Sequence, residues 1–383
     1  MALADGRSGR LLVWQDHPEF AGHEMMFCQV LPGLLQRFEA VQVNFPSCNA
    51  GFAKALGRFD DPRLIRSPIP FTRISAELYR APFRRAYRRF VDAAYDAFRP
   101  TVSLVLQGRI ENAGAPLLTL ARRPARLVSY LPMAHSCREI SSFAAGTGAP
   151  DLLRRFYYRI PERFIVPSQA VAAQVMRAGG RKALVVENIA PSGVARGDKR
   201  EARALLNFPQ DQKLAVVLGR LKTRHKGLDR LLQMISAQRD SLQDWRFLLI
   251  GKGEGEADLK ALVESSGLSD LVTFIPWLEN PSAVYSAADL MLMPARYEGV
   301  PLVLLEAMAY GAPVLGSHID VFTEYLPEAS RFSFEGEDGL KAAMERTLSA
   351  EGAQAYAEAC ARHLPRLTQA ASSDAFVAAL CGA

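Results

Sequence analysis

The sequence lacks several features that would assign it to a particular class of protein. None of its apolar runs reaches about eighteen residues, and its start, MALADGRSGR, lacks the charged-then-apolar order of a signal peptide. Its five cysteines are odd in number and never form a CxxC arrangement, so neither a disulfide framework nor a zinc site is expected. With 49% hydrophobic residues and none of these features, we expect a cytoplasmic globular protein.

Acidic residues are scarce in the first half of the chain. Residues 1–190 carry 26 Lys and Arg against 15 Asp and Glu, a formal net charge of +11, although the whole chain carries only +6. The second half is therefore mildly acidic. This asymmetry indicates that the first half faces something anionic, such as a phospholipid surface, a phosphate-bearing molecule or a nucleic acid.

Short apolar segments alternate with helical patterns along the chain, which is typical of parallel sheets built from βαβ units. We expect an α/β fold with two doubly wound, Rossmann-like domains that face each other across a cleft. The predicted strands are residues 10–15, 40–45, 102–107, 126–131, 163–167 and 183–187, and then 213–219, 245–251, 271–275, 288–294 and 312–316.

A polar stretch rich in glycine and charge separates the two series of strands. It predicts a linker at residues 191–210, between a first domain at residues 1–190 and a second at residues 211–350. Residues 351–383 are expected to form C-terminal helices, which are candidates for packing back on the first domain.

The most informative segment is RYEGVPLVLLEAMAYGAP, residues 296–313. Pro301 suits the first turn of a helix and Gly311 suits its end, so Glu298 lies just before the helix and Glu306 lies inside it. The amides and the positive dipole end at the helix start favour a diphosphate, and the two carboxylates can accept hydrogen bonds from sugar hydroxyls. The alternative is a helix whose acidic residues only complement its dipole.

A second segment, LAVVLGRLKTRHKGLD, covers residues 214–229. A strand ends at Gly219, a basic loop follows, and a helix begins near Gly227. Arg220 and Lys226 bracket this loop, where two cations can stabilise the charge on a departing nucleoside diphosphate. The alternative is a solvated basic loop.

Four segments in order resemble family-four retaining glycosyltransferases of the two-Rossmann-domain GT-B architecture: GRLKTRHKGLDRLL, LLIGKGEGEADL, VTFIPWL and YSAADLMLMPARYEGVPLVLLEAMAYGAPVL. They cover about the second half of the chain. In the first half the resemblance is weaker and rests on LLVWQDHPEFAGHE, RLVSYLPMAHS, RFIVPSQA and ALVVENI. Lys252 and Pro276 depart from the residues usual in the family, which leaves the base of the nucleotide open between UDP and GDP.

The resemblance implies roles for individual residues. In the second half, Arg220 and Lys226 would bind the diphosphate, Glu298 the donor sugar and Glu306 the ribose. In the first half, His135 would reach the donor sugar near the reacting carbon, and Gly22 would let the backbone approach the donor phosphate. A lone histidine is also common as a structural residue. The remaining positions implied for the nucleotide sugar are Gly251, Gly253, Trp277, Gly299, Val300, Pro301 and Leu302.

Residues 80–92, RAPFRRAYRRFVD, predict a basic amphipathic helix. Its aromatic stripe would consist of Phe83, Tyr87 and Phe90, with Arg84, Arg85, Arg88 and Arg89 beside it. Such a helix suits an anionic membrane surface, so the protein is expected to be peripheral on the inner face of the plasma membrane. The alternative is a surface helix that packs its aromatic rings into the first domain while its arginines stay solvated.

Together these features predict a retaining enzyme that moves a sugar from a nucleoside diphosphate sugar to a hydroxyl of a glycan, a lipid-linked acceptor or a surface polysaccharide such as lipopolysaccharide. No cofactor besides the donor is expected, and no metal, because the metal-holding Asp-x-Asp pair is absent and Arg220 and Lys226 can replace the ion. Nucleic acid is not an expected partner.

Three alternatives stay open. One is a nucleotide-sugar epimerase of the same architecture. Another is a Rossmann oxidoreductase, suggested by GKGEG at residues 251–255, although its spacing is not GxGxxG. The last is a non-catalytic protein that binds anions or nucleic acid through the basic half.

Overall fold

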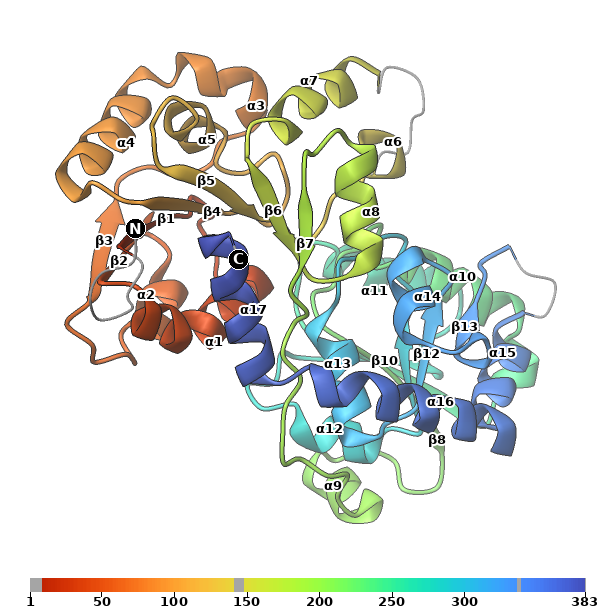
Figure 1. The fold of residues 1–383 in the computed structure, drawn as a ribbon. Helices are drawn as coiled ribbons and strands as arrows, with labels where there is room; N and C mark the ends of the chain where they lie inside the picture. The colour runs from red at the N-terminus through yellow and green to blue at the C-terminus, as the bar shows by residue number, and fades with distance from the viewer. Residues whose placement is uncertain (1–8, 141–147, 336–338, 383) are drawn as a thin grey trace. The chain divides into compact units, whose positions relative to one another are not determined.

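The computed structural model describes residues 9–140, 148–335 and 339–382 of the chain. It divides into two compact units, which Figure 1 shows with most of the helices and strands labelled. The first unit is Met1–Ile189 with Gln369–Ala383, and the second is Ala190–Thr368. The chain therefore leaves the first unit after Ile189 and returns to it for its last helix.

The first unit is built on a parallel sheet of seven strands in the order β3-β2-β1-β4-β5-β6-β7. The strands are β1 (Arg10–Trp14), β2 (Ala40–Pro46), β3 (Leu64–Ile69), β4 (Val102–Leu106), β5 (Arg126–Tyr130), β6 (Arg163–Val166) and β7 (Ala183–Val185). The helices are α1 (Gly22–Arg37), α2 (Ala50–Leu56), α3 (Glu77–Arg80), η1 (Ala81–Phe83), α4 (Arg85–Phe98), α5 (Gly114–Leu120), α6 (Cys137–Ile140), α7 (Gly148–Tyr158), α8 (Gln169–Arg177) and α17 (Gln369–Cys381).

The second unit repeats this plan with a sheet of six strands in the order β10-β9-β8-β11-β12-β13. The strands are β8 (Lys213–Leu218), β9 (Trp245–Ile250), β10 (Val272–Ile275), β11 (Leu290–Met293), β12 (Val314–Ser317) and β13 (Arg331–Phe332). The helices are α9 (Lys199–Leu205), α10 (Leu228–Ala237), η2 (Arg239–Leu242), α11 (Glu256–Ser265), α12 (Ser282–Ala287), α13 (Leu302–Tyr310), α14 (Asp320–Tyr325), η3 (Glu328–Ser330), α15 (Gly339–Leu348), α16 (Ala350–His363) and η4 (Leu364–Arg366).

In both sheets the strand order reverses at one point. The reversal lies between β1 and β4 in the first sheet and between β8 and β11 in the second. Ligands of doubly wound sheets bind beside the carboxyl ends of the strands at such a reversal. The segments that follow these strands in the second unit are residues 219–227 and 294–301, which contain the predicted diphosphate-sugar residues.

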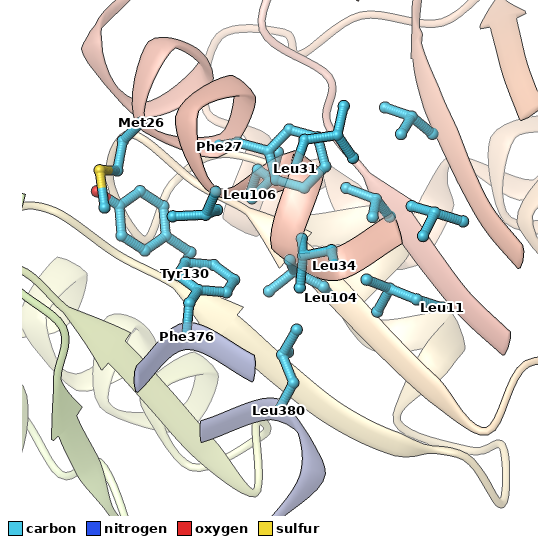
Figure 2. Close-up of a cluster of buried hydrophobic side chains, with 14 of the residues drawn as sticks. Leu11, Met26, Phe27, Leu31, Leu34, Leu104, Leu106, Tyr130, Phe376 and Leu380 are labelled. Carbon is cyan, nitrogen blue, oxygen red and sulfur yellow. The ribbon is translucent and has the colours of Figure 1, made fainter. Parts of the chain in front are cut away.

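The C-terminal helix completes the core of the first unit. Figure 2 shows Phe376 and Leu380 of α17 beside Leu104, Leu34 and Tyr130, and all five side chains are buried. The rings of Tyr130 and Phe376 lie 5.8 Å apart, centroid to centroid. Burying a phenylalanine or leucine side chain contributes about 1.5–3 kcal/mol, so α17 is an integral part of this unit rather than a loose tail.

Two arginines of the sheet hold the end of the same helix. Arg126 donates to the carbonyl oxygen of Leu380 at 3.1 Å, and Arg163 donates to that of Ala379 at 3.3 Å. The last carbonyls of a helix have no partner within it and carry its negative dipole end, so cationic donors stabilise them.

The α/β class with two doubly wound parallel sheets is confirmed, and each predicted strand is present, with its ends shifted by no more than two residues. Two strands were not predicted. The edge strand β3 contains Pro68, which an edge tolerates because its missing N–H need not pair. Strand β13 has only two residues and leaves no pattern in the sequence.

The predicted linker, residues 191–210, contains helix α9, whose first turn is capped by the side chain of Asp198. Arg203 of this helix donates to the carbonyl oxygen of Ala287 at 3.0 Å and to Asp289 at 2.6 Å. Arg203 is buried and paired, so a polar side chain takes one of the inward positions of this helix, which weakens any apolar periodicity in the stretch.

Candidate functional site

The loops that follow β8 and β9 run beside each other. The amide of Gly219 donates to the carbonyl of Ile250 at 2.9 Å, and that of Leu221 donates to Lys252 at 3.0 Å. The amide of Gly255 donates back to Leu221, also at 3.0 Å. These bonds extend the pairing of the two strands past their carboxyl ends.

Gly251 and Gly253 make this close approach possible. Gly251 has a φ of +149°, and a Cβ built on it would lie 1.8 Å from the carbonyl oxygen of Gly219. A Cβ on Gly253 would lie 2.4 Å from the carbonyl oxygen of Leu221. Both positions therefore require glycine for the local backbone geometry, apart from any ligand.

Lys226, at the end of the loop after β8, contacts Glu298, which lies between β11 and α13. The Lys226 ammonium donates to Glu298 Oε1, and His225 Nε2 lies 3.6 Å from the same oxygen. Burial alone would raise the pKa of Glu298, but Lys226 and His225 outweigh it and lower this pKa to about 2. Glu298 is therefore a buried carboxylate at neutral pH, available to accept hydrogen bonds.

Arg296 joins the basic loop to the segment that carries Glu298. Its guanidinium contacts both carboxylate oxygens of Asp229, at 2.6 and 2.7 Å, and donates to the carbonyl of Arg224 at 2.8 Å. Its amide donates to the carbonyl of His225 at 3.1 Å. Two-pronged arginine–carboxylate pairs restrict orientation strongly, so this contact fixes the register of the two segments.

A ring contact supports the same register. The imidazole of His225 stacks on the ring of Tyr297, with centroids 4.4 Å apart and planes inclined by 6°. His225, Tyr297, Arg296 and Asp229 were not singled out in the sequence. Arg296 and Asp229 are 67 residues apart in the chain. In addition, an acidic residue in the first turn of α10 is already explained by the helix dipole, so Asp229 did not stand out.

Helix α13 begins at Leu302, one residue later than predicted. Pro301 is its N-cap residue, with φ −70° and ψ 134°, so the prediction that Pro301 lies within the first turn is wrong. Its extended ψ keeps it outside the helix, although its φ is the one proline requires. Gly311 ends the helix in the left-handed conformation, as predicted.

Glu306 lies inside α13 and is held by a tyrosine of α12. The hydroxyl of Tyr285 donates to Glu306 Oε2, and the Tyr285 ring stacks on Tyr310 with centroids 5.0 Å apart. Burial and the nearby carboxylate raise the pKa of Tyr285 far above its usual range, so the hydroxyl stays protonated as a donor. Tyr285 therefore orients the carboxylate that the resemblance assigns to the ribose.

The other predicted residues of this unit differ in exposure. Gly299 and Val300 are buried beside Glu298, and Leu302 is half-buried at the start of α13. Arg220 is exposed, and its guanidinium has no acceptor within the described part of the chain. Trp277, directly after β10, is 49% exposed. Arg220 and Trp277 thus offer free groups at the carboxyl ends of β8 and β10.

Residues 198–363, somewhat less than half of the chain, match the family model described as glycosyl transferases group 1. The matched segment contains the Lys226–Glu298 pair, Glu306 and the loops after β8 and β9. This matched segment, residues 198–363, is called the group 1 domain below.

Two curated relatives are each similar to part of this chain. The lipopolysaccharide core biosynthesis mannosyltransferase LpsB of Rhizobium meliloti is 30% identical over 184 residues, which cover 46% of this chain and 49% of LpsB. The O-antigen biosynthesis glycosyltransferase WclY of Escherichia coli is 31% identical over 144 residues, 38% of this chain and 39% of WclY. The chain therefore spans less than half the length of each of these relatives.

Solved structures match over nearly the whole chain. HepE of Anabaena, in complex with UDP and glucose, has a TM-score of 0.75 at 17% identity, covering 98% of this chain and 100% of HepE. WaaG, a glycosyltransferase involved in lipopolysaccharide biosynthesis, has a TM-score of 0.69 at 14% identity, and the match covers 98% of this chain and 100% of WaaG. These matches show the fold, and the predicted GT-B architecture is confirmed.

Outside the group 1 domain, His135 and Gly22 belong to the first unit. His135 follows β5 and is 7% exposed, with its Nδ1 3.9 Å from Glu139 Oε2. Gly22 is the exposed first residue of α1, which starts beyond the carboxyl end of β1. The amide before it, of Ala21, is occupied by Glu24 at 2.8 Å.

The segment predicted as one amphipathic helix is interrupted. Helix α3 ends at Arg80, and the turn η1 that follows it ends at Phe83. Arg84 has a non-helical backbone, and α4 starts at Arg85. Phe83 is 79% exposed whereas Tyr87 is 1% exposed, so the three rings do not form one stripe, and that prediction is wrong. The alternative of aromatic rings packed into the first domain holds for Tyr87 and partly for Phe90.

The packing of Tyr87 explains the difference. Its hydroxyl accepts a hydrogen bond from Trp14 Nε1 at 2.8 Å, and its ring stacks on Phe71 with centroids 4.6 Å apart. Arg84 also lies over this ring, 4.5 Å from its centroid, and pairs with the buried Glu77 at 2.8 Å. Arg88 is half-buried and donates to Thr119 at 3.3 Å. Arg85 and Arg89 remain exposed.

Among the described residues, no three His, Cys, Asp or Glu side chains are grouped as a metal site would require. In the same part of the chain, none of the helices combines the length and the apolar character needed to cross a membrane.

Proposed function

We propose that the protein is a retaining glycosyltransferase that moves a sugar from a UDP- or GDP-linked donor to a hydroxyl of a glycan or lipid-linked acceptor. The observation that carries this proposal is the contact between Lys226 and Glu298 at the strand reversal of the group 1 domain. It joins a cation suited to a diphosphate and a carboxylate suited to sugar hydroxyls at the place where such sheets bind ligands.

The geometry explains how one site can serve both parts of the donor. An ammonium group has three N–H donors, and Glu298 uses one of those on Lys226, so two remain for diphosphate oxygens. The free guanidinium of Arg220 adds further donors, and no side chain caps the first turn of α13. These groups can carry the charge of a diphosphate without a metal ion.

The family resemblance implies the chemical step, and these positions are compatible with it. The bond between the anomeric carbon and the diphosphate oxygen breaks while the acceptor oxygen bonds to the same face of that carbon. The proton of the acceptor hydroxyl passes to the departing phosphate oxygen. Lys226 and Arg220 stabilise the negative charge on this oxygen, and Glu298 holds the sugar through its hydroxyls.

The relatives suggest the class of acceptor. LpsB and WclY, each about 30% identical to part of this chain, are named for lipopolysaccharide core and O-antigen biosynthesis. We therefore infer that the acceptor is a growing bacterial surface polysaccharide on the cytoplasmic side of the membrane.

An anionic membrane surface is a further proposed partner. Phe83 and Tyr79 are 79% and 52% exposed on consecutive turns, and Arg85 and Arg89 are exposed on the helix that follows. Exposed rings beside arginines suit the headgroup region of an anionic bilayer. The membrane proposal therefore rests on this surface and no longer on Tyr87 and Phe90.

The first experiment identifies the donor nucleotide by its effect on the thermal stability of the protein. Nucleoside diphosphates and their sugars, added singly to the full chain, should raise the melting temperature for one base, because a ligand that binds only the folded state stabilises it. Incubation of that sugar donor with a surface-polysaccharide acceptor should then release the nucleoside diphosphate. Conversion of the donor without any acceptor would instead indicate an epimerase.

A further inference from the structure

A cavity lies within the first unit, among α6, α7 and α8. Its volume is about 440 Å³, which is in the range of small-molecule pockets. Its walls include His135 after β5, Tyr158 at the end of α7 and Arg177 at the end of α8. Apart from His135, the proposed transfer reaction makes no use of these residues.

The hydroxyl of Tyr158 is the first sign of a ligand. Tyr158 is 2% exposed, and its hydroxyl has no hydrogen-bond partner in the described chain. Burial raises the pKa of Tyr158, so the hydroxyl stays protonated and can donate. A buried hydroxyl without a partner is unfavourable, and a ligand in the cavity can supply the missing acceptor.

The positive side chains at the cavity are the second sign. Arg155 of α7 and Arg177 of α8 both line it, both are exposed, and neither guanidinium has an acceptor among the described residues. Arg154 is different, because it is buried and already pairs with Glu111 and Asp151. The two free guanidinium groups can therefore bind an oxyanion.

The acidic side chains at the cavity are already occupied by donors of the protein. Asp151 accepts the amide of Cys137 at 2.7 Å as well as a bond from Arg154. Glu139 accepts both the amide and the hydroxyl of Ser136, at 2.6 and 2.8 Å. Arg155, Arg177 and Tyr158 thus keep donor groups that a ligand in the cavity can use.

We propose that this cavity binds the acceptor, and that the acceptor presents an acidic sugar whose carboxylate or phosphate is held by Arg155 and Arg177. The hydroxyl of Tyr158 donates to the same sugar. The assignment of this ligand as the acceptor rests on the proposed glycosyltransferase function. His135 lines the cavity, so an acidic sugar bound there lies beside the histidine that the family resemblance assigns to the donor sugar.

Direct binding to the full chain tests the proposal. The probes are glucuronate, glucose 6-phosphate, glucose and inorganic phosphate, measured by ligand-observed NMR or calorimetry. Glucuronate or glucose 6-phosphate should bind at least about tenfold more tightly than glucose, because an ion pair adds to the hydroxyl contacts. Whichever of the two binds more tightly identifies the anion as carboxylate or phosphate.

Matched variants connect the binding to these residues. Arg155→Gln and Arg177→Gln should each weaken binding of the acidic sugar about tenfold. Arg159→Gln removes an exposed arginine one turn further along the chain, outside the cavity lining, and should change nothing. Tyr158→Phe should also weaken binding without lowering the melting temperature, because its hydroxyl has no partner to lose among the described residues.

Other outcomes overturn the proposal. One is that all the probes bind with equal affinity, and another is that inorganic phosphate binds as tightly as the acidic sugars. A third is that the acidic sugars bind the wild type and both cavity-arginine variants equally. The donor measurement is separate. If a nucleoside diphosphate stabilises the protein and no acidic sugar binds, only the cavity proposal fails. If an acidic sugar binds and no nucleotide does, only the transferase function fails.

Discussion

Lys226 and Glu298 are 72 residues apart in the chain and in direct contact in the folded protein. Lys226 ends the loop after β8, and Glu298 lies in the segment after β11. Because β8 and β11 are neighbouring parallel strands, their carboxyl ends bring the two side chains to the same edge of the sheet. The pair between Arg296 and Asp229 then fixes the two segments in register.

Removing either member of this contact should abolish transfer. We expect Lys226→Ala and Glu298→Ala each to reduce the rate by at least about a hundredfold, as loss of a charge-stabilising donor typically does. Initial rates of nucleoside diphosphate release measure this. Lys260→Ala is the matched control, because it breaks a Lys–Glu pair with Glu256 on the exposed side of α11. Retention of most activity in either site variant would contradict the assignment.

The low pKa of Glu298 predicts a specific dependence of stability on pH. Its pKa falls from 4.5 to about 2 on folding, so its charged form contributes on the order of 3 kcal/mol to the free energy of unfolding at neutral pH. This contribution is fully present above about pH 5 and is lost as the pH falls toward 2. Denaturant titrations should therefore show wild type and Glu298→Gln converging over that interval.

The control for this pH dependence is Glu254→Gln. Glu254 pairs with Lys222 at 3.2 Å, but its side chain is 76% exposed, and such surface pairs contribute little. The stability difference between wild type and Glu254→Gln should stay small at every pH. A Glu298→Gln difference that is equally flat would mean that the ion pair does not form in solution.

Glu306 should affect binding of the donor more than the chemical step. The resemblance assigns it to the ribose, which is remote from the reacting carbon, so Glu306→Gln should raise the KM for the donor about tenfold and leave kcat nearly unchanged. Tyr285→Phe keeps the carboxylate but removes its orienting donor, and a smaller rise in KM is expected. A drop in kcat without a change in KM would place Glu306 elsewhere in the reaction.

Gly227 should tolerate no side chain. It adopts φ +64°, and a Cβ there would lie 1.8 Å from the carbonyl oxygen of Pro294. Gly267 has the same φ but open space around it. Gly267→Ala should therefore lower the free energy of unfolding only by the strain of an alanine in the left-handed conformation, about 1–2 kcal/mol. Thermal melts should show Gly227→Ala clearly less stable than Gly267→Ala, since it also forces the loop after β8 away from β11. Equal losses would refute this close approach.

The surface around Phe83 should mediate membrane binding. Phe83→Ser is expected to reduce co-sedimentation with liposomes of anionic lipid without changing the melting temperature, because this ring is 79% exposed. Leu205→Ser is the control, since it removes a 75% exposed apolar side chain from the second unit. Unchanged sedimentation of the Phe83 variant, or an equal loss in both, would reject the proposed surface.

Tyr87 provides the opposite test of the same segment. The sequence placed it on the membrane-facing stripe, whereas the structure buries it against Phe71 and the indole of Trp14. Tyr87→Ala should therefore lower stability by about 3–5 kcal/mol, in the range of other buried aromatic-to-alanine changes. A variant with normal stability but reduced liposome binding would favour the original prediction.

The sequence alone determined the features that depend on neighbouring residues. Alternating apolar and helical segments specified two parallel sheets, because strand and helix periodicities are local. Gly311 marked the end of α13 for the same reason, and the order of the motifs placed the residues predicted for the diphosphate sugar in the second unit. Strands β3 and β13 could not be predicted from the sequence, because an edge strand with a proline and a two-residue strand leave little apolar periodicity.

The tertiary structure decided which side chains meet. The contacts of Arg296 with Asp229, of Tyr285 with Glu306 and of Tyr87 with Trp14 join residues 67, 21 and 73 positions apart. No local periodicity encodes such pairings, because they depend on which strand ends are neighbours in the sheet. The same holds for the cavity with the unpartnered Tyr158 hydroxyl, whose walls come from three separate helices. Sequence motifs thus predicted the class of chemistry, whereas the packing of the strands and helices determined which side chains lie together at the proposed site.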